Sequence, residues 1–371
     1  MARLIKDKYE AWKQECNERF MQLKANEEEL NRIFIDIYGL QDELTPDVAD
    51  KDVTVHFIVD SKEEIPESMK GSNYILTKRD NIVSLISYAV GCMLGRYSLD
   101  VEGLAYAGGD WDSVFRRDVL ADESGDRILF GNNSIAVKNR YTQINRDGEW
   151  IDVSFEPDAD NCLPITDEEY FQDDIVGRFV EFIKVVYGAE TLEENLQFVA
   201  DALGGKGSTS RAVIRNYFLN DFYKDHCQTY SVTGSGKRPI YWLFDSGKQN
   251  GFKALVYMHR WNADTIGNIT AEYLIRMQKT YEHEMVTCQE IIENSTNNRD
   301  IAVANKRKDK LQKQYKETQD YYVKMSHLAN ERIDIDLDDG VKVNYRKVQT
   351  SREGEFLEIL ADSKDIMVKE K

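Results

Sequence analysis

Residues 237–260 constrain the fold more than any other segment of this chain. Two runs rich in aromatic and β-branched residues, 239–244 and 252–257, flank the turn-forming sequence Ser-Gly-Lys-Gln-Asn-Gly. This pattern predicts two antiparallel strands joined by a short loop. Cations at the outer ends and rings along both strands suit the phosphates and bases of a nucleic acid. The alternative is a hairpin whose rings fill a core and whose cations are solvated, because aromatic side chains are usually buried.

Charge is unevenly distributed along the chain. The formal net charge of −18 over 371 residues argues against indiscriminate DNA binding. Residues 150–200 hold two cations against thirteen acids, a net charge of −11, whereas residues 205–260 hold nine cations against three acids, a net charge of +6. An acidic body with one basic, aromatic-rich segment fits a site-selective binder, because acidic surface elsewhere suppresses phosphate contacts. Plain charge scatter is the alternative.

Composition predicts a cytoplasmic protein that contacts no membrane. Hydrophobic residues make up 42% of the chain, which argues against disorder. No run of eighteen apolar residues is present, and the first twenty residues are too charged for a signal peptide. The five cysteines form no Cys-x-x-Cys pair and the five histidines lack ligand spacing, so we expect reduced thiols and no metal site.

Hydrophobic periodicity predicts an α+β fold, with a mixed target-recognition-like domain followed by a long antiparallel helical hairpin. Helices are expected over residues 3–38, ending at Gly39, and in two arms that a polar break at 294–298 separates. Capping boxes at 166–169 and 191–194 each predict a helix start. The second arm also carries a cluster of lysines and arginines, interpreted as a solvated face or as a phosphate-tracking surface.

These elements predict four segments. They are a helical connector and strand at 1–67, the target-recognition-like domain at 68–267, the helical hairpin at 268–333 and a C-terminal tail at 334–371, of which residues 346–371 are expected to be weakly ordered.

Several of these runs resemble one family. They are the hairpin itself, the helix at 214–227, the run Ile-Ser-Tyr-Ala-Val-Gly-Cys-Met-Leu-Gly-Arg-Tyr-Ser-Leu-Asp at 86–100, and the segments 26–40 and 336–345. Together they are similar to the C-terminal part of the large adenine-specific DNA methyltransferases of BREX phage-defence systems, the PglX family. That family is related to single-chain restriction–modification enzymes.

The motifs of the catalytic half of such enzymes are absent from this sequence. Methyltransferases of this kind hold the flipped adenine with an Asn/Asp-Pro-Pro-Tyr/Phe motif, but no two of the five prolines here are adjacent. No Gly-rich loop after a strand is present to bind S-adenosylmethionine. We therefore expect a piece of a longer protein that has neither catalytic nor cofactor residues of its own. The resemblance implies that S-adenosylmethionine would be bound by the missing half.

The resemblance implies a DNA-recognition region that acts beside a catalytic methyltransferase half, with double-stranded DNA and other BREX proteins as partners. From charge and periodicity, we predict that DNA is contacted by Arg211, Arg215, Lys237, Arg238 and Lys253, with Tyr241 and Trp242 as base or sugar contacts. The alternative function is an assembly module that binds other defence proteins through the helical hairpin and the acidic 150–200 region.

Overall fold

The computed structural model describes residues 4–118, 141–232 and 236–361. These residues form two compact units, the first made of residues 4–87 and 183–214 and the second of residues 88–118, 141–182, 215–232 and 236–361. Both contain helices and short strands, so the predicted α+β class is confirmed. The described helices are α1 (Ile5–Tyr38), α2 (Lys78–Met93), α3 (Trp111–Val114), α4 (Ile175–Tyr187), α5 (Leu192–Leu203), α6 (Ser210–Asn220), α7 (Phe222–Thr229), α8 (Thr265–Ile269), α9 (Ile275–Asn294), α10 (Asn298–Glu331) and α11 (Gly340–Lys347).

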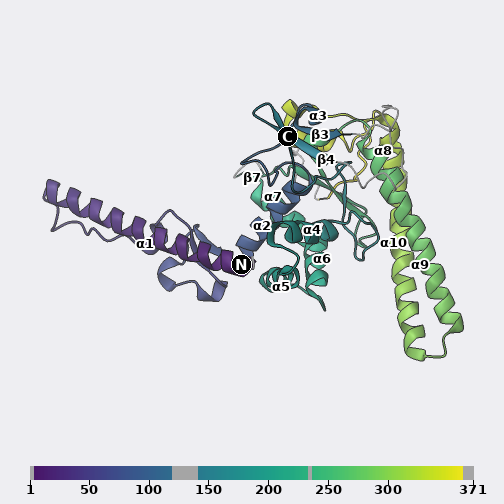
Figure 1. The fold of residues 1–371 in the computed structure, drawn as a ribbon, viewed down its shortest axis with the longest axis horizontal. Coiled ribbons are helices and arrows are strands. Elements are labelled where there is room, and N and C mark those ends of the chain that lie inside the picture. The colour runs from purple at the N-terminus through teal and green to yellow at the C-terminus, as the bar shows by residue number, and fades with distance from the viewer. Residues whose placement is uncertain (1–3, 119–140, 233–235, 362–371) are drawn as a thin grey trace. The chain divides into compact units, whose positions relative to one another are not determined.

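The first unit is built on the long helix α1 (Figure 1). The helix ends as predicted at Gly39, whose φ of 67° is the left-handed conformation that glycine adopts most readily. The parallel strands β1 (Phe57–Val59) and β2 (Ile75–Thr77) lie beside it. Their core contains the buried residues Tyr9, Cys16 and Ile58, against which Leu76 and Phe198 pack.

The second unit has an antiparallel three-stranded sheet at its centre, with the strands β6 (Leu163–Pro164), β10 (Lys253–Tyr257) and β9 (Tyr241–Asp245) in that order. In β9 and β10, Tyr241 pairs with Tyr257, and Leu243 pairs with Leu255, so the hairpin predicted from residues 237–260 is confirmed. Four of the five residues in each strand are buried. The hairpin therefore lies in the core. The other described strands are β3 (Phe115–Asp118), β4 (Tyr141–Arg146) and β5 (Glu149–Asp152), which form a second sheet, and β7 (Ser231–Val232) and β8 (Gly236–Lys237), which form a small ladder.

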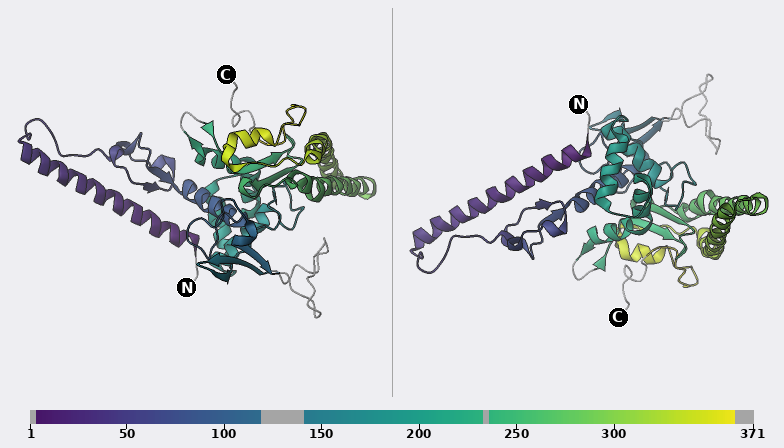
Figure 2. Two further views of the ribbon diagram at one scale, coloured as in Figure 1. Left: turned by 90° about the horizontal axis from the view of Figure 1, so that it is seen from above. Right: turned by 90° about the horizontal axis from the view of Figure 1, so that it is seen from below.

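Helices α9 and α10 form the predicted antiparallel hairpin (Figure 1), and Figure 2 shows them side by side. A π-helical turn, Thr270–Leu274, joins α8 to α9. The predicted polar break lies between the two long helices, and the Asn297 side chain accepts a hydrogen bond from the backbone N–H of Arg299 at the start of α10. This hairpin belongs to the same compact unit as the central sheet.

Glu317 of α10 binds the loop between β9 and β10. Its carboxylate accepts hydrogen bonds from the Ser246 hydroxyl (2.8 Å) and from the backbone N–H groups of Gln249 (2.8 Å) and Gly251 (3.0 Å). The Tyr281 hydroxyl of α9 donates to the Gly251 carbonyl at 2.7 Å. Both helices thus bind the same tight loop, and this requires close approach of the backbones.

Gly251→Ala is expected to destabilise the second unit by about 1–3 kcal/mol, because overpacking forces the backbone to shift. A Cβ at this position would lie 2.7 Å from the Gln314 carbonyl oxygen and 3.1 Å from Thr318 Cγ2. Urea unfolding measures the change. The matched control is Gly267→Ala in α8, whose Cβ meets nothing within 4 Å and which should be neutral or slightly stabilising. Equal stabilities for the two variants would contradict the packing argument.

Two expectations about local structure are wrong. Residues 166–169 do not open a helix; α4 begins at Ile175, and Asp174 accepts the backbone N–H of Val176 at its start (2.9 Å). Residues 348–361 are not a weakly ordered tail, because Val348, Ile359 and Leu360 are buried and Leu360 bridges to Phe244 of β9. The rest of the predicted tail, residues 362–371, lies outside the described residues. The domain limits at 67/68, 267/268 and 333/334 stay a prediction.

Candidate nucleic-acid interface

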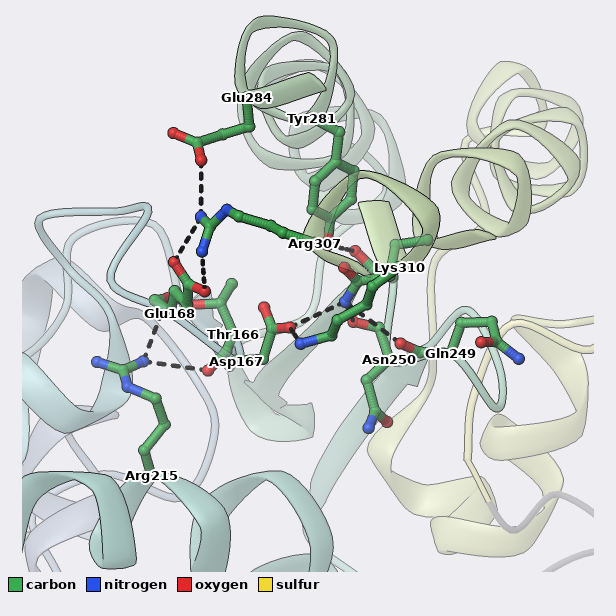
Figure 3. A network of polar contacts seen from close by, with 12 residues as sticks. Thr166, Asp167, Glu168, Arg215, Gln249, Asn250, Tyr281, Glu284, Arg307 and Lys310 are labelled. Carbon is green, nitrogen blue, oxygen red and sulfur yellow. Dashed lines mark hydrogen bonds and ion pairs between the residues drawn. The ribbon is translucent and has the colours of Figure 1, made fainter. Parts of the chain in front are cut away.

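Arg211 and Arg215 lie one turn apart on α6, but their environments differ. Arg211 is exposed and makes a two-pronged ion pair with Glu193, at 2.7 Å for each N–O contact. Arg215 is mostly buried and pairs at 2.6 Å with Asp174, whose side chain has no exposed surface. The Arg215 guanidinium also donates to the Thr166 carbonyl at 3.1 Å (Figure 3). Arg215 is therefore an internal counterion, and only Arg211 presents its charge at the surface.

The aromatic members of the predicted set lie inside the protein. Tyr241 and Trp242 have 1% and 0% of their surface exposed. The Trp242 indole N–H donates to the Pro239 carbonyl at 3.1 Å. Lys253 reaches inward to Asp245 (3.3 Å) and to a backbone carbonyl of α6. A nucleic acid at the surface would reach none of these three side chains in this structure.

Lys237 and Arg238 lie at and just after β8. Arg238 is exposed and Lys237 is partly exposed. The backbone N–H of Arg238 donates to the Tyr230 carbonyl at 2.8 Å, which fixes this strand against the end of α7. Of the seven predicted residues, Arg211, Lys237 and Arg238 are thus the ones that lie at the surface, exposed or partly exposed.

A further cation, in the same compact unit as Lys237 and Arg238, was missed from the sequence. Arg96 follows α2 and is partly exposed, and its guanidinium donates to the hydroxyls of Tyr97 (3.3 Å) and Tyr257 (3.0 Å). Tyr257 in turn donates to the Tyr106 carbonyl at 2.9 Å. An arginine in a Gly-Arg-Tyr sequence at a helix end is an ordinary C-terminal cation. The sequence therefore gives little sign that tyrosines distant in sequence surround this arginine.

His226 lies next to this cluster. Its ring stacks on Tyr241 with 4.6 Å between centroids, and its Nε2 accepts the Tyr241 backbone N–H at 3.1 Å. Burial, together with the charge of Arg96, lowers the pKa of His226 to about 3. The imidazole is therefore neutral, its proton lies on Nδ1, and Nδ1 is a buried donor without a partner in the described part of the chain.

Arg307 and Lys310 of the basic cluster of α10 bind carboxylates inside the unit (Figure 3), whereas Lys306, Lys313 and Lys316 are exposed. Arg307 binds Glu168 at 2.7 Å and Glu284 at 2.6 Å, and Lys310 pairs with Asp167. These contacts attach α10 to the segment before α4. The two interpretations of this cluster from the sequence, a solvated face and a phosphate-tracking surface, did not include these internal ion pairs.

Part of the acidic 150–200 region is also internal. Burial, and then the neighbouring Asp158, raises the pKa of Asp160 to about 8. The Tyr273 hydroxyl lies 2.8 Å from Asp160 and 2.7 Å from Asp173. Asp158 and Asp174 are buried, so not all of the formal negative charge of this region lies at its surface. No cluster of carboxylate, histidine or cysteine side chains suited to a metal ion occurs within residues 4–118, 141–232 and 236–361, and none of the helices there is long and apolar enough to cross a membrane.

Sequence comparison links this chain to adenine-specific methyltransferases. No family model matches the chain. It is 41% identical over 344 residues, 92% of its length, to the adenine-specific methyltransferase PglX of Lacticaseibacillus casei (strain Zhang). It is 36% identical over 295 residues, 78% of its length, to the adenine-specific methyltransferase BrxX of Escherichia coli O9:H4 (strain HS). The matches cover 24% and 21% of these relatives, so the chain spans about a quarter of their length. The chain matches a C-terminal part of the BREX adenine-specific methyltransferases, as the resemblance predicted.

Proposed function

We propose that this chain is the non-catalytic DNA-recognition region of a BREX-type adenine-specific DNA methyltransferase that acts in phage defence. The observation that carries the proposal is the match of 92% of the chain to a quarter of PglX, in a sequence without adjacent prolines for an adenine-binding motif. Methylation of a base in duplex DNA requires the base to be flipped out while other protein surface holds the flanking duplex. This chain would supply that surface.

The partners follow from this role. Double-stranded DNA is the ligand, and a catalytic half with bound S-adenosylmethionine acts on the adenine, in the cytoplasm and alongside other BREX proteins. The accessible cations Arg211, Lys237 and Arg238 would contact backbone phosphates, which position the protein on the duplex. Arg215, Tyr241, Trp242 and Lys253 would contribute by holding the fold that carries those cations.

The test is fluorescence anisotropy of this chain with a labelled mixed-sequence duplex across a salt series. We expect the logarithm of the binding constant to fall linearly with the logarithm of salt concentration. The double variant Lys237→Glu/Arg238→Glu should bind at least tenfold more weakly at low salt. If each of the two cations neutralises one phosphate, the salt slope of this double variant should also be smaller in magnitude by about 2.

The matched control reverses two exposed lysines of α10, Lys313→Glu/Lys316→Glu, and changes the net charge by the same amount. Its affinity should stay within about twofold of the wild type at physiological salt, where long-range effects are screened. No binding by the wild-type chain at low salt, or equal losses in the two variants, would contradict the proposed recognition role.

A further inference from the structure

Arg96 is a partly buried cation that donates hydrogen bonds to tyrosine hydroxyls. Its guanidinium has five N–H donors, and hydrogen bonds to Tyr97 and Tyr257 use two of them. Among the residues that the structure describes, the groups that interact with the Arg96 guanidinium are tyrosine hydroxyls rather than carboxylates. Burial opposes its charged form, yet the hydrogen bonds that it donates to Tyr97 and Tyr257 keep its pKa above the ordinary value. A permanent positive charge is thus held in place without a neutralising partner.

The surroundings of Arg96 are electropositive and rich in donors. Its charge contributes to the lowered pKa of both His226 and His259, after burial itself. The Nδ1 atoms of both imidazoles are buried and have no partner in the described segments. A cation held in a low-dielectric setting costs free energy unless an anion completes the site.

Rigid packing holds this arrangement in place. Gly91 of α2 leaves room for the Tyr97 ring, since a Cβ there would lie 2.3 Å from Tyr97 Cδ2. Tyr97 also stacks on Tyr88 with 5.3 Å between centroids. Arg96 accepts, through its carbonyl, the backbone N–H of Ala105 at 2.8 Å. The guanidinium is therefore preorganised, which lowers the cost of binding a ligand.

The cluster lies next to the predicted DNA-binding strand. Tyr230, whose carbonyl holds the Arg238 backbone, lies 4.8 Å from His226 between ring centroids. Arg238, just after β8, and the Arg96 cluster are thus connected through Tyr230, whose hydroxyl also lies within hydrogen-bonding reach of Arg96 and Tyr97. Arginine suits phosphate because its planar fork can donate two parallel hydrogen bonds.

We infer that Arg96, with the Tyr97 and Tyr230 hydroxyls beside it, binds a phosphate of the DNA backbone. This rests on the proposed DNA-recognition function and adds a specific phosphate contact to it. Arg96 neutralises the phosphodiester, and the hydroxyls, which can rotate to donate, hydrogen-bond its oxygens. The charge of Arg96 is then balanced only in the complex.

The test compares Arg96→Gln, Arg96→Lys and the wild type in duplex-binding salt series, with the melting temperature of each measured first. Arg96→Gln should lower affinity about tenfold and reduce the magnitude of the salt slope by about 1, the value for one lost phosphate contact. Arg96→Lys should keep the slope while binding about threefold more weakly, because lysine acts as a point charge. If Arg96→Gln does not fold, Tyr97→Phe, which removes only a hydroxyl, should still weaken binding about threefold.

The matched control is Arg178→Gln. Arg178 is also mostly buried and lies over the Phe155 ring at 4.7 Å, but it pairs with Glu181. Loss of the Arg178 guanidinium should leave the salt slope of duplex binding unchanged. A folded Arg96→Gln with wild-type affinity and slope would overturn the phosphate site while leaving the recognition function intact.

A second probe separates the two proposals if the wild-type chain does not bind DNA. Sodium phosphate, compared with sodium chloride at equal ionic strength, should raise the melting temperature of the wild type by a few degrees, and that of Arg96→Gln by less than half as much. This result would support an anion site that takes free phosphate, although the recognition function had failed. Equal responses of the two proteins would overturn the site.

Discussion

Replacing Arg215 by methionine is expected to lower the free energy of unfolding by about 3–5 kcal/mol, because removal of one partner leaves an uncompensated buried charge. The charge concerned is Asp174, whose side chain is fully buried and lies 2.6 Å from the guanidinium. The Thr166 carbonyl would lose a donor at the same time. Urea or thermal unfolding monitored by circular dichroism measures the loss.

The matched control lies one turn earlier on the same helix. Arg211→Met breaks an exposed ion pair with Glu193, and exposed pairs contribute about 0–1 kcal/mol. Adding Asp174→Asn to Arg215→Met should recover much of the lost stability, since the amide oxygen can still accept the Val176 N–H while the charge is gone. A cost for Arg215→Met no larger than that for Arg211→Met would show that the buried pair does not stabilise the fold.

Acidification between pH 6.5 and pH 3 should destabilise the protein through His226. Burial lowers the folded-state pKa of this residue to about 3, below the ordinary value near 6.5, so the unfolded chain binds more protons in this window. The stability contribution is complete above pH 6.5 and is lost as the pH falls toward 3. A shift of this size corresponds to at most about 5 kcal/mol.

The variant His226→Gln isolates this effect. Glutamine can still accept the Tyr241 N–H but does not titrate, so the difference in unfolding free energy between the two proteins should shrink as the pH falls. Buried or paired carboxylates titrate in both proteins and cancel in that difference. A difference independent of pH from 7 to 4 would show that His226 is not held neutral by the fold.

Local patterns predicted the local parts of this fold. The end of α1 at Gly39, the β9–β10 hairpin and the α9–α10 pair all follow from periodicity and turn residues that lie close together in sequence. The capping box at residues 166–169 failed because Thr166 instead donates to Asp174 at 3.0 Å. That alternative hydrogen bond competes with capping and depends on the tertiary structure.

The candidate site was harder to predict because its pairings are long-range. Arg215 and Asp174 are 41 residues apart, and Arg96 and Tyr257 are 161 residues apart. Charge and aromatic content singled out the 237–260 segment as a candidate, but they could not distinguish a ring that faces a base from one that fills a core. Tyr241 and Trp242 are buried because β9 is enclosed on both faces, so the alternating pattern of a half-exposed strand is absent.

The π-helical turn Thr270–Leu274 limits how the helical hairpin could be exchanged between relatives in chimeric proteins. A π turn holds one residue more than the α-helix requires, and its deletion would rotate the helix beyond it by about 100°. Met277 and Tyr281, both buried, would then leave the core. The turn is also tied down by Tyr273 through its hydrogen bonds to Asp160 and Asp173. A chimera should therefore be joined upstream, in the exposed loop at Asn262–Asp264, so that the turn and its helices are inherited together.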